Sequence, residues 1–253
     1  MSTSFVFVST AYDCVSAAEQ CFKTMYAQSY DRWRLILLDD SPTGCVADAV
    51  DALAQRLGFS RERVLTVRNN ERVGEVTNTL RACETIDPNE VVVRVDMDDW
   101  LVDNDTLAIF DKIYRETGAG CVWAGHRWCD GIETISSKNI SGPLPSDGCD
   151  VYAELLDNWV TSHPKSFRKD LIDAVNPTNF LDENGKTITI ACDRAIYCPV
   201  LEMSKRMGRP RIFAGIVATH YNLRLSDPDL FSNERSLEQR RSAEFIHKRG
   251  FIA

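Results

Sequence analysis

The sequence predicts an α/β fold in which a mostly parallel central sheet is flanked by helices. Short runs of β-branched and aromatic residues alternate with segments of helical periodicity through the first hundred residues. The chain has 253 residues, of which 44% are hydrophobic and 26% are charged, as is usual for a globular protein. One domain spanning 1–253 can bury a core of its own at this length, although two small domains would also fit it.

The first half of the chain alternates regularly between predicted strands and helices. Each strand is a short apolar run bounded by turn-forming residues, and each helix carries its apolar residues on one face. The predicted strands are 5–9, 35–38, 64–67 and 91–95. The helices predicted between them are 15–25, 46–57 and 76–83.

The second half is less regular, and its predicted helices and strands do not alternate. A loop rich in Gly, Ser, Pro and Asp is expected at 130–150, and loops of this length are often functional. Helices are predicted at 105–114, 191–203 and 236–248, and strands at 121–124 and 217–222.

Charge and cysteine content exclude several classes of protein. Lys and Arg total 29 against 37 Asp and Glu, a net charge of −8, so no broad binding of nucleic acid or anionic lipid is expected. The nine cysteines are scattered without a C-x-x-C pair, which is typical of reduced thiols. No apolar run reaches the roughly 20 residues of a membrane span, and the N-terminus lacks a basic flank typical of a signal peptide. These features predict a cytoplasmic protein.

Polar side chains follow each of the four predicted strands. Ligands of parallel α/β sheets bind beyond the carboxyl ends of the strands, so these side chains are the first candidates for a site. They are Thr10, Tyr12, Asp13, Asp39, Asp40, Arg68, Asn69 and the cluster at 96–99.

The acidic cluster Asp96, Asp98 and Asp99 carries the most informative chemistry. Carboxylates crowded at the end of a buried strand repel each other unless a cation or a basic group neutralises them. Hard oxygen ligands suit Mg²⁺ or Mn²⁺, ions that share their remaining positions with substrate phosphates. A solvated turn or a helix cap is the structural alternative. The position after a fourth parallel strand favours the metal.

Four segments of the first hundred residues, 5–12, 26–30, 37–41 and 95–101, occur in an order and spacing that resemble the nucleotide-sugar half of glycosyltransferase family 2. Three later segments resemble small bacterial and viral members of that family: 162–168, 193–202, and Tyr221-Asn222 followed by Asp227-Pro228. The resemblance implies a single domain of the GT-A fold, with a donor lobe at 1–101 and an acceptor lobe at 102–253. It also implies a metal-dependent, inverting transfer of sugar from a nucleoside diphosphate sugar, a UDP-sugar above all, to an acceptor hydroxyl of a glycan or another carbohydrate-like acceptor, with Mn²⁺ or Mg²⁺ as the cofactor.

The resemblance also implies roles for particular residues. Thr10 and Tyr12 would line the nucleotide base pocket, and Asp39 or Asp40 would accept hydrogen bonds from the base or ribose. Asp96 would contact the ribose or metal-bound water, and Asp98 would ligate the metal. The donor would also approach Arg72 and Asn78, although Thr77 stands where family members often have Arg.

Asp193 matches the carboxylate that acts as general base in inverting members. A base must lie opposite the leaving diphosphate, within hydrogen-bond reach of the acceptor. A carboxylate opening a helix can also simply cap it, and Asp182 and Glu183 are nearby competitors for the base role. His220, at the end of an apolar strand, is a further candidate metal ligand; packing in the strand is its structural alternative.

The remaining candidates have stronger structural alternatives. His163 is expected to be structural, and core packing is the default expectation for Trp123, Trp128 and Trp159, whose other reading is an acceptor platform. The basic residues between 205 and 211 are expected to form a solvated surface.

Three other functions remain open at this stage. A nucleotidyltransferase shares the sheet and the acidic site, but the Gly-rich basic loop of that class is missing after the first strand. A non-catalytic nucleotide-sugar binding module is a second alternative. A glycosyltransferase acting on a modified DNA base is a third, disfavoured by the net charge of −8.

Overall fold

The four predicted strands of the first half pair in parallel in the computed structural model, which describes residues 2–130, 133–136, 141–223 and 232–253. Strand β1 (Phe5–Ala11) lies between β2 (Trp33–Asp39) and β4 (Val91–Arg94), and β3 (Val64–Arg68) pairs with the far side of β2. Their carboxyl ends therefore meet at one edge of the sheet, which is where the polar residues after each strand are brought together.

The second half completes the sheet with mixed pairing. Strand β8 (Ser162–Arg168) is antiparallel to β4 and to β6 (Cys121–Asp130). Strand β9 (Arg211–Asn222) runs parallel to β6 and antiparallel to β5 (Trp100–Leu101), while β7 (Glu133–Ser136) pairs with β6. Within the described residues the order is β3-β2-β1-β4-β8-β6-β9-β5. An α/β fold with helices around a central sheet is thus confirmed, although only its first half is uniformly parallel.

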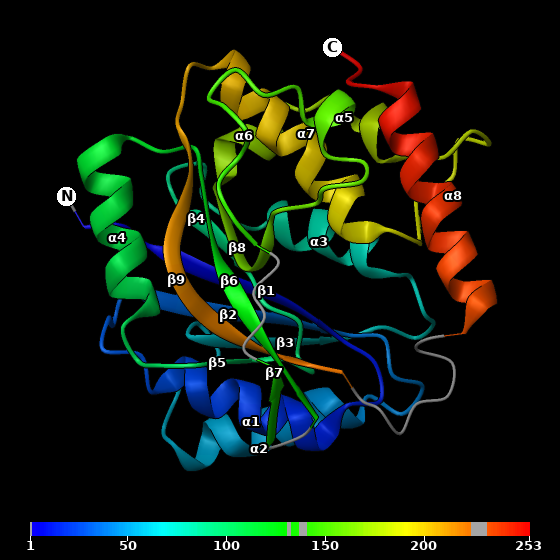
Figure 1. Cartoon of the computed structure of the whole chain (residues 1–253). Helices are drawn as coiled ribbons and strands as arrows, with labels where there is room; N and C mark the ends of the chain where they lie inside the picture. The colour runs from blue at the N-terminus through cyan, green and yellow to red at the C-terminus, as the bar shows by residue number, and fades with distance from the viewer. Residues whose placement is uncertain (1, 131–132, 137–140, 224–231) are drawn as a thin grey trace.

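Helices cover both faces of the sheet (Figure 1). On one face lie α1 (Val15–Tyr26), α2 (Cys45–Arg56) and α4 (Thr106–Thr117). The other face carries α3 (Glu75–Cys83), α5 (Val151–Glu154), α6 (Lys169–Asp173), the 3₁₀ helix Pro177–Phe180, α7 (Cys192–Arg206) and α8 (Asn233–Arg249).

Strand β1 shows how the sequence builds the two-sided core. Phe5 and Phe7 pack toward the face of α1 and α2, whereas Val6 and Val8 pack toward the opposite face. All four are fully buried, because successive side chains of a strand point to opposite faces and both faces of this sheet are covered.

Several predicted boundaries shift. The strand predicted at 121–124 extends to Asp130, and the strand predicted at 217–222 begins at Arg211. The loop predicted at 130–150 contains β7, and its residues 131–132 and 137–140 lie outside the described part of the chain, as do Asp227 and Pro228.

All nine cysteines are free thiols, as expected. In the part of the chain that is described, no helix is long and apolar enough to cross a membrane. The sheet crosses the predicted lobe boundary at the β4–β8 pair, and the division into lobes stays a prediction.

Candidate active site

The acidic loop after β4 is held in place by its backbone. The amide of Met97 donates to the carbonyl of Thr10 at the end of β1 (3.2 Å), and the amide of Asp99 donates to the carbonyl of Asp96 (3.0 Å). Met97 is fully buried and Asp99 is 2% exposed, while Asp96 and Asp98 are half-buried. The loop therefore buries the carboxylate of Asp99 and leaves those of Asp96 and Asp98 half-buried at the carboxyl edge of the sheet.

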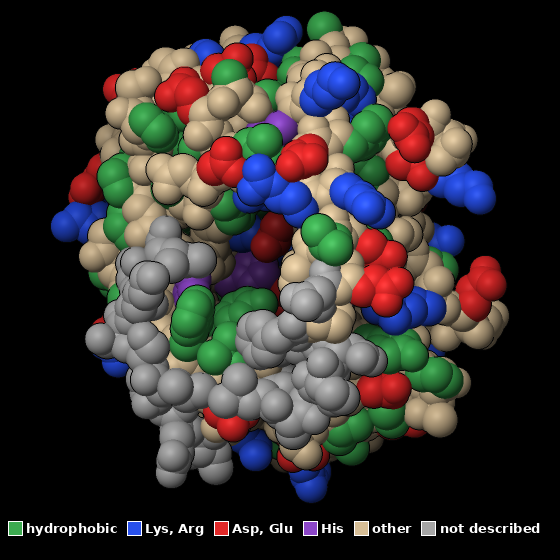
Figure 2. Space-filling model, turned by 45° about the vertical axis from the view of Figure 1, so that its right-hand side comes forward, with side chains coloured by type: hydrophobic (Ala, Val, Ile, Leu, Met, Phe, Trp, Pro, Cys, Tyr) green, Lys and Arg blue, Asp and Glu red, His purple; other side chains and the backbone are tan. Residues whose placement is uncertain are grey.

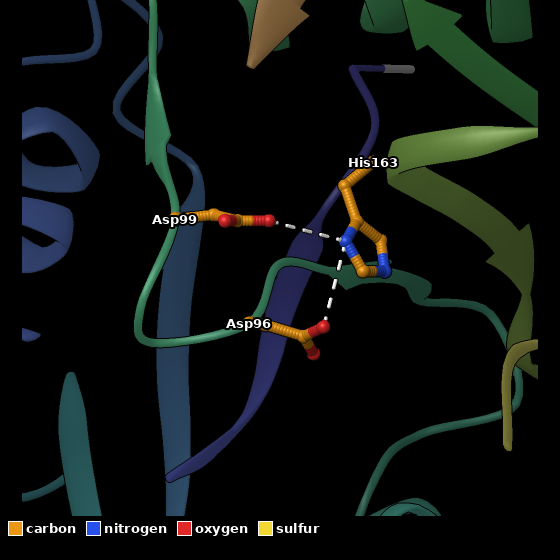
Figure 3. Close-up of side chains that lie close together, drawn as sticks. All are labelled: Asp96, Asp99 and His163. Carbon is orange, nitrogen blue, oxygen red and sulfur yellow. Dashed lines mark ion pairs between the residues drawn. The ribbon is translucent and has the colours of Figure 1, made fainter. Parts of the chain in front are cut away.

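His163 enters this acidic loop from β8. The antiparallel pairing of β4 with β8 ends at Arg94 and Lys165. His163 lies two residues further along β8, beside Asp96. Its Nδ1 lies 3.6 Å from Asp96 Oδ2 and 3.5 Å from Asp99 Oδ2 (Figure 3). One possible ligand atom from each of Asp96, Asp99 and His163 lies within 4.8 Å of the other two. We call these three residues the Asp-Asp-His cluster.

His163 brings a positive charge into the Asp-Asp-His cluster. Burial lowers the pKa of His163, but the carboxylates of Asp96, Asp193 and Asp99 outweigh it and raise the pKa to about 10. Burial raises the pKa of Asp99 to about 7, against the lowering effect of His163. The imidazolium thus serves as the counter-ion of carboxylates whose burial is otherwise costly.

The donor set also fits a divalent cation. Asp99 Oδ1 accepts from the backbone amide of Asn222 (2.9 Å), but its buried Oδ2 has no hydrogen-bond partner among the described residues. The imidazole at 3.5 Å is too distant for a normal hydrogen bond. Two carboxylates and an imidazole are ligands that Mn²⁺ accepts. An ion there would take over the neutralising role of the His163 proton.

A buried arginine, Arg94, contacts the Asp-Asp-His cluster through Asp96. The guanidinium of Arg94, on β4, is 3% exposed and lies 3.2 Å from Asp96 Oδ1 and 2.7 Å from Glu75 Oε1. It also donates to the hydroxyl of Thr79. Glu75 and Thr79 belong to α3. Arg94 therefore connects this helix to the carboxylate of Asp96.

Asp193 stands in the first turn of α7 and faces the same strand β8. Its carboxylate forms an ion pair with Lys165 and lies 3.5 Å from His163 Nε2. Lys165 is 2% exposed, whereas the Asp193 side chain is 46% exposed. Burial raises the pKa of Asp193, but Lys165 and His163 outweigh it and hold that pKa well below its usual range. The carboxylate is therefore ionised and fixed in position.

The residues predicted to bind the donor base lie at the same edge of the sheet. Tyr12 is 39% exposed, and the Arg72 guanidinium lies 4.3 Å from the centroid of its ring. Thr10, at the end of β1, is half-buried. Tyr12 and Arg72 thus form an accessible aromatic and cationic pair.

Asp39, Asp40 and Asn78 take structural positions. Asp39 is fully buried and accepts from the backbone amides of Ser41 and Ala47 (2.8 Å each), so it holds the start of α2. Asp40 accepts from Asn69 Nδ2 (2.7 Å) and from the amide of Gly74 (2.8 Å). Asn78 is fully buried, accepts from Asn69 Nδ2 (2.8 Å), and has no partner for its Nδ2 among the described residues. Donor contacts by these three residues stay predictions.

His220 and Asp98 are not part of the Asp-Asp-His cluster. His220 pairs with Trp100 across β9 and β5, with ring centroids 5.9 Å apart. Burial, together with Arg127, lowers its pKa. Asp98 lies half-buried in the acidic loop. Metal ligation by either residue stays a prediction.

Sequence reasoning took His163 for a structural residue and did not single out Lys165. His163 and Lys165 are two residues apart on one strand, a spacing that directs both side chains to the same face. This spacing was the signal by which the sequence could have shown that the two residues act together.

Asp193 also borders a cavity of about 350 Å³, which we call the Asp193 cavity. The face of the molecule that carries α8 is hollowed near its middle, where histidine and acidic side chains are visible at depth (Figure 2). The cavity is lined by Leu156, Trp159, Ala191, Asp193, Arg194, Ser236, Gln239, Arg240 and Ala243.

A second hollow of about 400 Å³ lies at the opposite edge of the sheet, near the amino ends of β1 and β2. Arg32, Trp33 and Arg34 line it, and the Arg63 guanidinium lies 4.3 Å from the ring of Trp33. None of the predicted site residues borders this hollow.

Solved structures define the class of protein to which this fold belongs. Residues 1–349 of S. aureus TarS match with a TM-score of 0.60 at 13% identity, covering 87% of this chain and 60% of that one. A mannosyltransferase from Pyrobaculum calidifontis, in complex with GDP-Man and Mn²⁺, matches with a TM-score of 0.61 at 16% identity, covering 98% of this chain and 70% of that one. The fold is that of the GT-A glycosyltransferases.

The family follows from the sequence itself. Residues 7–175 match the model of glycosyl transferase family 2. This chain belongs to glycosyl transferase family 2. A search of the curated proteins found no match. The S. aureus TarS fragment was also solved in complex with UDP-GlcNAc, and that structure matches with a TM-score of 0.59 at 12% identity, covering 87% of this chain and 58% of that one.

Proposed function

We propose that this chain transfers a sugar from a nucleoside diphosphate sugar to an acceptor hydroxyl, with inversion at the anomeric carbon. The observation that carries the proposal is the position of Asp193. This carboxylate lies 3.5 Å from His163 of the Asp-Asp-His cluster and also lines the Asp193 cavity. A general base for this reaction must lie within hydrogen-bond reach of the acceptor hydroxyl, on the side of the anomeric carbon opposite the leaving diphosphate.

The donor side of the site fits a nucleotide sugar and a divalent ion. The similar structures named above hold UDP-GlcNAc in one case and GDP-Man with Mn²⁺ in another. In this chain Asp96, Asp99 and His163 would hold the ion, with Asp98 as the further ligand predicted from sequence. When bound, Mn²⁺ or Mg²⁺ neutralises charge on the donor diphosphate. Tyr12 and Arg72 would receive the nucleotide base, and a UDP-sugar is the donor we propose.

Asp193 supplies the proton acceptor. The acceptor hydroxyl oxygen forms a bond to the anomeric carbon as the bond from that carbon to the diphosphate breaks. The electron pair of the broken bond goes to the phosphate oxygen, and the hydroxyl proton goes to Asp193. Lys165 and His163 hold the carboxylate in place and keep it ionised, which fits a base that must be deprotonated before each turnover. We place this activity in the cytoplasm, which the nine free thiols support.

Replacing Asp193 by Asn tests the role of this residue as the base. The amide keeps the shape of the side chain but cannot take the proton, so transfer should fall by about 10²–10⁴-fold. Binding of the nucleotide with Mn²⁺, measured as a rise in melting temperature, should persist. Undiminished transfer by Asp193→Asn would contradict the assignment. Nucleotide binding by the wild-type chain without transfer to any acceptor would favour a binding module instead.

A matched variant controls for damage to the fold. Asp193→Asn leaves the buried Lys165 ammonium without its carboxylate, whereas Lys165→Met leaves a carboxylate that is 46% exposed. An uncompensated buried charge is the costlier defect. We therefore expect Asp193→Asn to lower the free energy of unfolding more than Lys165→Met does, as measured by denaturant titration. The double variant Asp193→Asn with Lys165→Met should recover part of the loss in stability and remain inactive.

A further inference from the structure

Arg194 lines the Asp193 cavity without an ion-pair partner among the described residues. Arg194 follows Asp193 in the first turn of α7, is half-buried, and lines the cavity. Its Nη1 donates to the carbonyl of Leu155 (3.1 Å) and to Nε2 of His247 (2.8 Å). Within the described part of the chain, no carboxylate forms an ion pair with Arg194.

The histidine partner of Arg194 must be neutral. Nδ1 of His247 lies 2.8 Å from the carbonyl of Tyr152, which can only accept, so Nδ1 carries the proton. A guanidinium can only donate, so Nε2 of His247 must be the unprotonated acceptor. Both partners of Arg194 therefore fix its position without cancelling its charge.

The other charges around the cavity are paired. Asp193 is matched by Lys165, with His163 nearby. Arg240, on α8, lies 2.8 Å from Asp157 and 2.7 Å from Glu244. Arg194 is thus the lining cation that has no acidic counterpart among the described residues, and a buried cation favours an anionic partner.

The remaining wall of the cavity suits a polar ligand with an apolar face. The Arg194 guanidinium lies 4.9 Å from the ring centroid of Trp159, and the Lys165 ammonium lies 5.8 Å from it. The buried indole Nε1 of Trp159 has no hydrogen-bond partner among the described residues. Ser236 and Gln239 add exposed polar groups from α8. About 350 Å³ is near the lower end of small-molecule sites, roughly 300–1,000 Å³.

We propose that the Asp193 cavity binds an acceptor saccharide that carries an anionic group, a carboxylate or a phosphate, and that Arg194 binds this group. The inference rests on the proposed function, because Asp193 marks the cavity as the acceptor side. Bidentate recognition of carboxylate or phosphate is the interaction to which a guanidinium is best suited. The anion would hold the acceptor with its hydroxyl next to Asp193.

Direct binding of small saccharides tests the proposal without requiring turnover. Glucuronate is compared with its uncharged amide, and glucose 6-phosphate with glucose, by ligand-observed NMR titration in the presence of a chelator. At least one anionic probe should bind about tenfold or more tightly than its neutral counterpart. The carboxylate and phosphate arms show which anion is preferred. Equal affinity for charged and neutral probes, or no binding of any probe, overturns the proposal.

Two variants assign the preference to Arg194. Arg194→Gln should abolish the preference for the anionic probe, and Arg194→Lys should restore part of it. Arg240→Gln removes a charge of the same sign from the same cavity, but this charge is already neutralised, so the preference should persist. A preference retained in Arg194→Gln, or lost equally in Arg240→Gln, contradicts the assignment. Binding of UDP with Mn²⁺ is measured in parallel, since its absence would count against the proposed function and not against the anion preference.

Discussion

Single residues of β8 decide the chemistry of this site. His163 and Lys165 are buried residues of one strand, and both lie next to Asp193, His163 also next to the acidic loop. One imidazole therefore lies near Asp96 and Asp99 through Nδ1 and near Asp193 through Nε2, which connects the proposed metal site to the proposed base.

The ligand set of the metal can be separated at this scale. We expect Asp99→Asn and His163→Ala each to abolish the Mn²⁺-dependent rise in melting temperature with a nucleotide, because each removes a ligand atom of the Asp-Asp-His cluster. Asp98→Asn should also abolish it if the predicted ligand role of Asp98 is right. His220→Ala, at a residue packed against Trp100, is the comparison variant. An unchanged Mn²⁺ effect in both Asp99→Asn and His163→Ala would contradict the cluster as the metal site.

Among the elements, α4 shows how one carboxylate joins distant segments. Asp111 of α4 accepts from the amide of Thr3 (2.8 Å), from the hydroxyl of Tyr30 (3.1 Å) and from Nε of Arg115 (2.8 Å). Burial raises the pKa of Asp111, but these hydrogen bonds outweigh it and lower the pKa below its usual value. The start of β1 is thereby fastened to α4.

The pH dependence of this contact is predictable. A carboxyl whose pKa is lower in the folded than in the unfolded chain contributes stability above its unfolded pKa, and the contribution is lost as the pH falls through the folded pKa. Asp111→Asn should therefore lower the free energy of unfolding at neutral pH by about 1–3 kcal/mol. The difference from wild type should shrink toward zero in acid, as measured by urea titration. A difference that is constant with pH would contradict this role.

At the scale of the whole molecule, charge pairing limits the partners. The net charge is −8, and the basic residues between 205 and 211 already have partners. Arg209 is bidentate with Asp170 (2.7 Å twice) and Arg206 pairs with Glu202 (3.1 Å). Arg211 and Lys205 both donate to the carbonyl of Cys149. Carboxylates therefore neutralise Arg206 and Arg209, whereas Lys205 and Arg211 are hydrogen-bonded to backbone carbonyls.

Duplex DNA should accordingly not bind. We expect no shift of a DNA duplex, with or without a modified base, in an electrophoretic assay at moderate salt. Binding that weakens steeply with salt would instead reveal phosphate contacts and favour the alternative of a DNA-modifying glycosyltransferase. A basic DNA-binding protein serves as the positive control.

The sequence by itself determined the first half of the fold, the acidic loop and the family. Apolar runs and helical periodicity are local signals, and both faces of β1, β2 and β4 are covered, so their strands read as continuous apolar runs. Asp96 and Asp193 were likewise singled out from their positions and from the resemblance, and both lie near His163. Their roles stay predictions.

Tertiary structure alone decided the rest. Strand β8 was missed because Ser162–Arg168 contains a proline and three basic residues in place of an apolar pattern. The strand is buried nonetheless, because residues distant in sequence neutralise its charged side chains. Asp193, which pairs with Lys165, lies 28 residues from it. The same long-range packing made His163 part of the cluster and left Arg194 without an ion pair among the described residues. No local pattern encodes such pairs, since they exist only once the strands and helices have packed.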